Sequence, residues 1–406
     1  MGETTKYDVA VLGLWWSSNY GSIMTYYSLY RLIESYGYRT VIIDRPGIGQ
    51  DDFLFTTDGR RFQREHFPVT PVFQFHELGK LNDYADCFVM GSDQVWNFGI
   101  CEKYQGAFFL NFAADNKKKL SYAASFGHPG FFAPPQAIEE TKHLLERFDG
   151  ISVRESSAVD LMRDTFGIVP ERVLDPVFAV DPKIFDDLLK TSRAAKEREG
   201  KKEPFLCTYI LDPTEAKREA LLYVAGEKNL PMVHMLDGYT ENFEANKKAL
   251  DLDDIVEDLK VEDWLYYISH CDFLITDSCH GASFAILFGK PFICIGNDGR
   301  GLPRFESLAG LFHLEKRFIY DAEEIEKRPD LLEPIDYREI HEILKKERKA
   351  SRKWLKDKLE APVRNEAYQE PEKSPGMKAL LKLYKVLRPL ISDNTKAKLK
   401  ALARRK

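Results

Sequence analysis

One histidine of this sequence lies where a predicted helix begins, between two short apolar strands. The segment Asp272–Gly296 has the pattern of strand, polar turn, helix, glycine turn and strand, and Phe273–Ile275 is its first buried strand. Ser278 can cap the helix. His280 then falls in the first helical turn, beside free backbone N–H groups and the positive end of the helix dipole. Ligands bind at the carboxyl ends of parallel strands, so this turn is a candidate site for an anion. The competing interpretation is a histidine that only packs or caps.

Further polar side chains follow the other predicted strands, where they would line the same edge of a sheet. Arg154 offers a planar pair of N–H donors that matches a carboxylate or phosphate, although an interdomain salt bridge would also explain it. Asp93 can accept a proton, or it can be an ordinary turn residue. The other polar turn residues in this group are Asn19, Tyr20, Ser92, Ser125 and Asp175.

Strands and helices alternate along nearly the whole chain, which predicts an α/β fold with parallel sheets. A polar, charged stretch at 194–203 separates two such halves. We therefore expect two Rossmann-like, doubly wound domains, 1–190 and 204–345, that face each other across a cleft. Domain interfaces of this kind are preferred ligand sites. A helical extension is expected at 346–370.

The composition and the missing motifs exclude several classes of protein. The chain has 406 residues, of which 44% are hydrophobic and 30% charged, as in ordinary globular proteins. It has no apolar run of about 18 residues, its six cysteines form no C-x-x-C pair, and we expect no signal peptide. We therefore expect a cytoplasmic protein without a zinc site or a disulfide framework. Neither G-x-G-x-x-G after the first strand, nor a P-loop, nor a G-x-S-x-G elbow occurs.

Charge is distributed unevenly between the body and the carboxyl-terminal segment. Residues 377–406 hold ten Lys or Arg against one acid, Asp393, whereas the whole chain has a net charge of −6. The remainder is therefore acidic, which argues against nucleic-acid binding. The segment 377–406 has the pattern of a basic amphipathic helix, which can contact an anionic membrane surface from the cytoplasmic side. The competing interpretation is a solvated tail or a helix packed on the body.

Six short motifs, in order, resemble those of the polysaccharide pyruvyl transferase family. They extend over nearly the whole predicted body and comprise Asn19–Gly21, Gly91–Trp96, Ser121–Ser125, Ser152–Glu155, Leu174–Pro176 and Ser278–Gly281. The resemblance implies a fold like that of glycosyltransferase B enzymes. It also implies transfer of the pyruvyl group of phosphoenolpyruvate to two hydroxyls of a sugar, with formation of a cyclic ketal and release of phosphate.

The resemblance assigns donor binding to Arg154 and His280, and less directly to Lys290, the nearest basic match after the histidine. Ser278 is expected to contribute to donor binding at the helix start. We expect His280 to protonate the donor and Asp93 to accept a hydroxyl proton. Candidate acceptor-binding residues are Asn19, Tyr20, Trp96 and Ser125. The reaction implied needs no metal and no cofactor beyond phosphoenolpyruvate as co-substrate.

Two other functions remain open from the sequence. The same fold carries nucleotide-sugar glycosyltransferases, and the helix start at Ser278 would suit a diphosphate. A non-catalytic glycan-binding protein is the third interpretation, although the presence of both Arg154 and His280 speaks against it. The acceptor sugar, which could be linked to a lipid or a nucleotide, is not specified by any motif.

Overall fold

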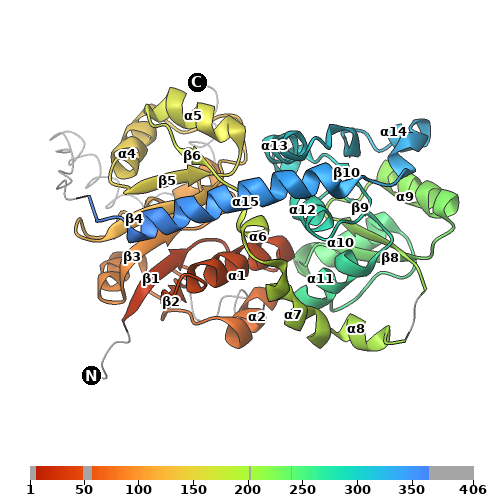
Figure 1. The fold of residues 1–406 in the computed structure, drawn as a ribbon, viewed down its shortest axis with the longest axis horizontal. Coiled ribbons are helices and arrows are strands. Elements are labelled where there is room, and N and C mark those ends of the chain that lie inside the picture. The colour runs from red at the N-terminus through yellow and green to blue at the C-terminus, as the bar shows by residue number, and fades with distance from the viewer. Residues whose placement is uncertain (1–5, 49–56, 201–202, 239, 365–406) are drawn as a thin grey trace, which may run out of the picture. The chain divides into compact units, whose positions relative to one another are not determined.

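The computed structural model describes residues 6–48, 57–200, 203–238 and 240–364, which form two parallel sheets with helices packed against them (Figure 1). Residues up to 366 belong to one compact unit. The predicted basic segment 377–406 lies outside the described residues. The expectation of two parallel-sheet α/β domains is confirmed.

The first sheet has six strands in the order β2-β1-β3-β4-β5-β6, all parallel. The chain leaves β1 for β2 on one side and returns to β3 on the other, so a topological switch point lies between β1 and β3. Its strands are β1 (Tyr7–Leu12), β2 (Thr40–Ile42), β3 (Ala85–Met90), β4 (Lys118–Ala124), β5 (Gly150–Val153) and β6 (Glu171–Arg172).

The second sheet has five parallel strands in the order β11-β10-β9-β7-β8. Its switch point lies between β7 and β9, so the two sheets repeat the same winding. Its strands are β7 (Leu206–Ile210), β8 (Met232–Leu236), β9 (Phe273–Thr276), β10 (Phe292–Ile295) and β11 (Phe318–Ile319).

Helix α1 lies at the junction of the two halves and is buried on nearly every side. It packs against α6, α11 and α12 as well as β2, and of its last residues only Arg31 and Glu34 are exposed. A helix that is apolar all round belongs in a protein interior. The helices of the first half are α1 (Tyr20–Glu34), α2 (Asp58–His66), α3 (Phe98–Cys101), α4 (Pro135–Leu145), α5 (Ser156–Phe166) and α6 (Pro176–Ala179). The connecting helices α7 (Asp186–Thr191) and α8 (Arg193–Glu197) pack against α11 of the second half.

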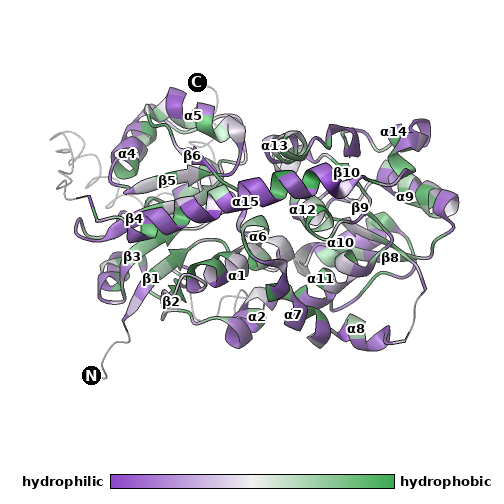
Figure 2. Cartoon of the chain, viewed as in Figure 1, coloured by the Kyte–Doolittle hydropathy of each residue, from purple (hydrophilic) through white to green (hydrophobic). Residues whose placement is uncertain are grey.

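Helix α15 (Tyr337–Glu360) crosses both halves (Figure 1); it begins before the helical extension expected at 346–370 and ends at Glu360. Hydrophilic and apolar residues alternate along this helix (Figure 2). Its buried residues include Ile340, Leu344, Leu355 and Leu359, which share one helical face. The other helices of the second half are α9 (Glu215–Lys228), α10 (Thr240–Leu250), α11 (Val261–His270), α12 (Cys279–Leu287), α13 (Leu302–Phe312) and α14 (Glu324–Lys327).

Polar contacts at both ends of α15 tie the two halves together. Near its start, the Tyr337 hydroxyl donates to the Lys290 carbonyl oxygen at 2.5 Å. Towards its end, Lys118 Nζ donates to the Leu359 carbonyl oxygen at 2.5 Å. Among the described residues, no helix is both long and apolar enough to span a lipid bilayer.

Candidate active site

His280 lies in the first turn of α12, directly after β9 at the switch point of the second sheet. Ser278 caps this helix as predicted, because its Oγ accepts a hydrogen bond from the Gly281 N–H at 3.2 Å. The His280 ring packs against α1, where a Cβ on Gly21 would come within 2.4 Å of the ring. Its Nε2 lies 3.1 Å from Thr25 Oγ1 and 3.8 Å from Asp175 Oδ2. The imidazole is therefore held between the two halves.

Arg154 follows β5 and is surrounded by carboxylates. Its Nη1 donates to Asp175 Oδ2 at 2.5 Å and its Nε to Glu155 Oε1 at 2.8 Å. Its Nη2 lies 3.5 Å from Asp93 Oδ1. The side chain of Asp175 therefore stands between Arg154 and His280, with one oxygen near both.

Asp93 follows β3 at the switch point of the first sheet and has a left-handed backbone, with φ of 67°. A non-glycine residue in this region is strained, and such strain often accompanies functional sites. Its Oδ1 also lies 3.3 Å from Nη1 of Arg304, on α13 of the second half. Asp93 therefore contacts two arginines that come from different halves.

The balance of charges keeps these carboxylates ionised. Burial alone would raise the pKa of Asp93, but His280, Arg154 and Arg304 hold it below its ordinary value. Burial opposes ionisation of Asp175 too, yet hydrogen bonding and charge from His280 and Arg154 keep its pKa well below the usual range. Opposite charges within a few ångströms favour the charged form in this way.

Two buried guanidinium groups are incompletely satisfied. Among the described residues, neither Arg154 Nη2 nor Arg304 Nε has a hydrogen-bond partner. Both arginines line one small cavity with a volume of about 30 Å³, together with Asp175 and Cys279. Buried N–H groups are normally paired, so unpaired donors of two cations beside a cavity favour an anionic ligand. His280 does not line this cavity and lies behind Asp175.

Lys290 is not brought to the Arg154–His280 cluster. It follows the end of α12 and precedes β10, whereas His280 lies at the opposite end of that helix. Its backbone N–H donates to the Ala285 carbonyl oxygen at 2.8 Å, closing the helix. The expectation that Lys290 binds donor therefore has no support from its position, because it lies at the amino-terminal edge of the sheet.

The four candidate acceptor residues occupy packing and capping positions. Asn19 caps α1 by accepting from the Ser22 N–H at 3.0 Å. The Tyr20 hydroxyl donates to the Leu259 carbonyl oxygen at 3.1 Å, and its ring stacks on Trp264. Ser125 is fully buried, and its Oγ accepts from the Gly127 N–H at 3.0 Å.

Trp96 is the clearest departure from the expected acceptor set. It is 0% exposed, and its Nε1 donates to the Phe108 carbonyl oxygen at 3.0 Å. Its ring stacks on Phe109 within an aromatic cluster of the first half. A sugar ring cannot reach it, so the sequence-based role of Trp96 is replaced by one in the core.

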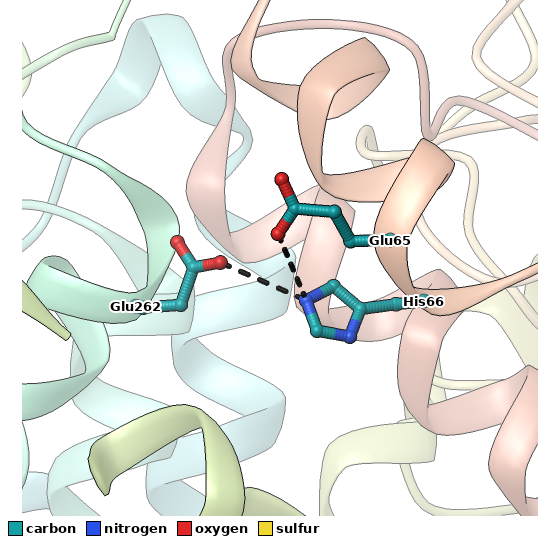
Figure 3. A group of neighbouring side chains, drawn as sticks. All are labelled: Glu65, His66 and Glu262. Atoms are coloured by element: carbon teal, nitrogen blue, oxygen red, sulfur yellow. Dashed lines mark ion pairs between the residues drawn. The ribbon is translucent and has the colours of Figure 1, made fainter. Parts of the chain in front are cut away.

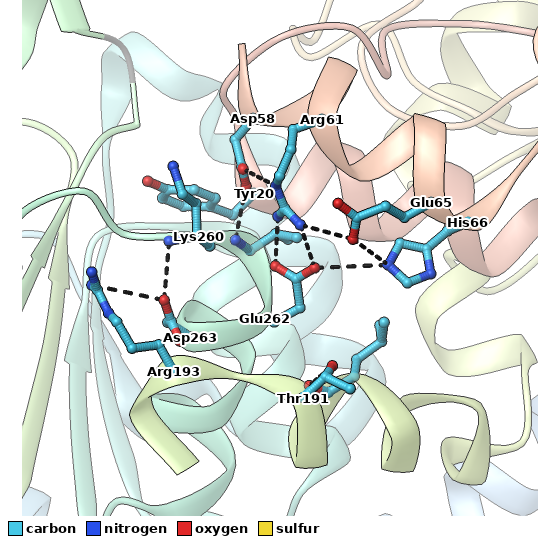
Figure 4. Close-up of polar contacts among 12 residues, drawn as sticks. Tyr20, Asp58, Arg61, Glu65, His66, Thr191, Arg193, Lys260, Glu262 and Asp263 are labelled. Carbon is cyan, nitrogen blue, oxygen red and sulfur yellow. Dashed lines mark hydrogen bonds and ion pairs between the residues drawn. The ribbon is translucent and has the colours of Figure 1, made fainter. Parts of the chain in front are cut away.

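A second ionic cluster joins the halves at α2 and α11 (Figure 4). Arg61 donates to both carboxylate oxygens of Glu262, at 2.7 and 2.6 Å, and its Nε to Asp58 at 2.8 Å. His66 and Glu65 complete the cluster (Figure 3). The nearest ligand atoms of Glu65, His66 and Glu262 lie within 4.8 Å of one another, a spacing that could hold a metal ion. Arg61 already neutralises Glu262, so we assign this cluster to interdomain ion pairing.

Two residues of the site have roles that the sequence did not assign to them: Asp175, which was expected only as a polar turn residue at this edge, and Arg304, which was not predicted. Asp175 had the appearance of a turn residue before Pro176, and it does cap α6 through the Val177 N–H at 3.1 Å. Its second oxygen, however, binds Arg154. Arg304 follows Pro303 in the first turn of α13, the helix that follows β10, as His280 lies in the first turn of the helix that follows β9. Proline near a helix start was the sequence signal that could have identified it.

A family model described as polysaccharide pyruvyl transferase matches residues 19–299. A search of curated proteins finds no match. Among solved structures, the UDP-GlcNAc 2-epimerase of Neisseria meningitidis bound to UDP-GlcNAc is 11% identical, with a TM-score of 0.52, over 87% of this chain and 99% of that chain. The Methanocaldococcus jannaschii UDP-GlcNAc 2-epimerase in complex with UDP-GlcNAc and UDP is 12% identical, with a TM-score of 0.50, over 86% of this chain and 98% of the other. These likenesses show the two-domain, glycosyltransferase B-like fold.

The Arg61–Glu262 pair makes stability depend on pH. Burial would raise the pKa of Glu262, but hydrogen bonds from His66 and Arg61 lower it from 4.5 to about 2. The folded-state pKa is thus depressed, so the stabilisation is complete above about pH 4.5 and is lost as the pH falls towards 2.

We expect Glu262→Gln to lower the free energy of unfolding at pH 7 by about 1–3 kcal/mol, because charged hydrogen bonds are removed. The difference from wild type, measured by urea denaturation, should stay constant above about pH 4.5 and shrink as the pH falls from 4.5 towards 2. Glu65→Gln is the control, since Glu65 is 56% exposed and lies 3.4 Å from Arg61; its effect should stay within about 0.5 kcal/mol. A Glu262→Gln effect of constant size across this pH range would contradict the assignment.

Proposed function

The chain belongs to the polysaccharide pyruvyl transferase family, and on this premise we propose that it transfers the pyruvyl group of phosphoenolpyruvate to two hydroxyls of a sugar. The product is a cyclic ketal on a glycan or glycan precursor of the cell envelope, and phosphate is released. The observation that carries the proposal is the cavity beside Arg154 and Arg304, where one nitrogen of each buried guanidinium group has no hydrogen-bond partner among the described residues.

The charges of the site suit this donor. Phosphoenolpyruvate carries a phosphate and a carboxylate, and each matches the paired N–H donors of an arginine. Arg154 comes from the first half and Arg304 from the second, so one donor molecule can engage both halves. Because carboxylates already surround Arg154, the donor must take the place of at least one of them.

Asp175 Oδ2 marks the position that a donor oxygen would take. This atom lies 2.5 Å from Arg154 Nη1 and 3.8 Å from His280 Nε2. An anion that replaces it would contact the guanidinium and the imidazole together. This exchange would bring His280, which lies behind Asp175, into reach of the donor.

The two hydroxyl protons of the acceptor are the only protons that the proposed reaction needs. In the overall reaction, one proton is added to the methylene carbon, which becomes a methyl group, and the other leaves with phosphate as hydrogen phosphate. The two hydroxyl oxygens form bonds to the central carbon while its bond to the phosphate oxygen breaks. We assign proton delivery to His280. Asp93, which is ionised, can accept a hydrogen bond from an attacking hydroxyl.

Phosphate release tests the proposed function directly. We expect purified protein, incubated with phosphoenolpyruvate and a panel of galactosides, mannosides and UDP-sugars, to release phosphate only when an acceptor is present. Release of UDP instead would indicate a nucleotide-sugar glycosyltransferase. Release of neither product would indicate a glycan-binding protein without this activity.

Replacing Arg154 tests donor binding. We expect Arg154→Lys to weaken phosphoenolpyruvate binding about 10- to 100-fold, because the positive charge remains but the paired N–H donors are lost. Isothermal titration calorimetry measures this change. Arg163→Lys is the control, since Arg163 is half-exposed on α5 and pairs with Asp160 and Asp164. Equal donor affinity in wild type and Arg154→Lys would remove Arg154 from the donor site.

Replacing His280 tests proton delivery. We expect His280→Gln to reduce kcat by roughly two to four orders of magnitude, while donor binding remains measurable. His234→Gln is a matched control, because His234 is also buried and its Nδ1 lies 2.8 Å from Thr208 Oγ1. It lies in β8 and should affect stability rather than kcat. Near-normal turnover by His280→Gln would show that the histidine only packs.

A further inference from the structure

We propose that the sugar acceptor binds in a groove between α5 and α13. This inference rests on the proposed function and gives the binding site of its second substrate. The groove has a volume of about 480 Å³, within the range typical of small-molecule sites. Both halves form it: Ser156 and Ser157 come from α5, and Glu306, Ser307 and Gly310 from α13.

The groove is adjacent to the proposed donor cavity. Arg172, Ser307 and Leu311 line both spaces. The groove also lies where β5 and β6 end and where the chain continues from β10 into α13, which is the edge of each sheet that binds ligands in such folds. A sugar in the groove can therefore present two hydroxyls towards a donor held by Arg154 and Arg304.

The side chains of the groove suit a ligand rich in hydroxyl groups. Serine hydroxyls both donate and accept hydrogen bonds, the Glu306 carboxylate accepts, and the Arg172 guanidinium donates. The halves already meet here through a hydrogen bond from the Ser156 N–H to Ser307 Oγ, 3.3 Å long. Arg172 is fixed by Glu347 at 2.6 Å, so its position at the junction of the two spaces is set by α15.

Gly310 lines the groove and is a position at which an added side chain can block it. It lies in the last turn of α13, and glycine is a poor helix former. Its φ is not among the positive values of the chain, so the backbone conformation does not require glycine. A Cβ at this position would meet nothing closer than Glu315 Oε1, 3.9 Å away, so packing does not require it either. Because glycine has no side chain, this position leaves open space in the groove.

A side chain at Gly310 should therefore obstruct the acceptor and leave the donor untouched. The variant is Gly310→Leu, and Gly226→Leu is its matched control, because Gly226 lies in α9 with nothing within 4 Å of an added Cβ. Gly310→Ala completes the set and should raise Tm slightly, since alanine favours the helix. Phosphoenolpyruvate affinity, measured by calorimetry, should be the same in all four proteins.

Acceptor binding is measured by saturation-transfer NMR with methyl galactosides and methyl mannosides, without donor. We expect at least one glycoside to bind wild type and Gly226→Leu, and the same glycoside to lose about tenfold or more in affinity for Gly310→Leu. Equal binding to Gly310→Leu and wild type would overturn the proposal, as would the absence of glycoside binding to wild type. Glycoside binding that depends on Gly310, without any phosphate release, would support the groove and refute the proposed pyruvyl transfer.

Discussion

The structure depends on the pairing of buried opposite charges where its two halves meet. Asp175, Asp93 and Glu155 surround Arg154, and Arg304 approaches Asp93 from the second half. Removing such charges from water is costly unless each is paired. The halves can close around this cluster only because arginines and carboxylates nearly balance. An anionic donor disturbs that balance, so donor binding and the arrangement of the carboxylates must be coupled.

Helix α1 determines how closely the halves approach each other. Gly21 allows the His280 ring to lie against the helix, and Thr25 lies 3.1 Å from its Nε2. Tyr20 contributes from the same helix by stacking on Trp264 of the second half. The N-terminal motif that includes Asn19 and Gly21 is therefore explained by domain contact rather than by sugar binding. This motif matters because Gly21 and the helix that begins beside it hold the His280 ring in position.

The sequence predicted the features that depend on local pattern. Alternation of strands and helices was sufficient for two parallel sheets, and Ser278 was recognised as the cap of the helix that carries His280. Local sequence patterns do not reveal which polar or aromatic residues are buried in the folded protein. Trp96 and Ser125 follow strands, as ligand-binding residues do, yet both are fully buried. It also could not show that Arg304 and Asp93, more than two hundred residues apart, meet at 3.3 Å, because that contact exists only when the halves close.

The proposed positions of donor and acceptor imply an order for the proposed reaction. The cavity beside Arg154 has a volume of about 30 Å³ and the groove beyond it about 480 Å³. Because Arg172, Ser307 and Leu311 border both spaces, a sugar seated in the groove would lie against the mouth of the donor cavity. A donor that arrived second would have to pass that sugar or enter from another side. Donor binding first, followed by the sugar, lets the arginines be satisfied before the hydroxyls approach. The same order keeps phosphate enclosed behind the acceptor until the ketal has left the groove.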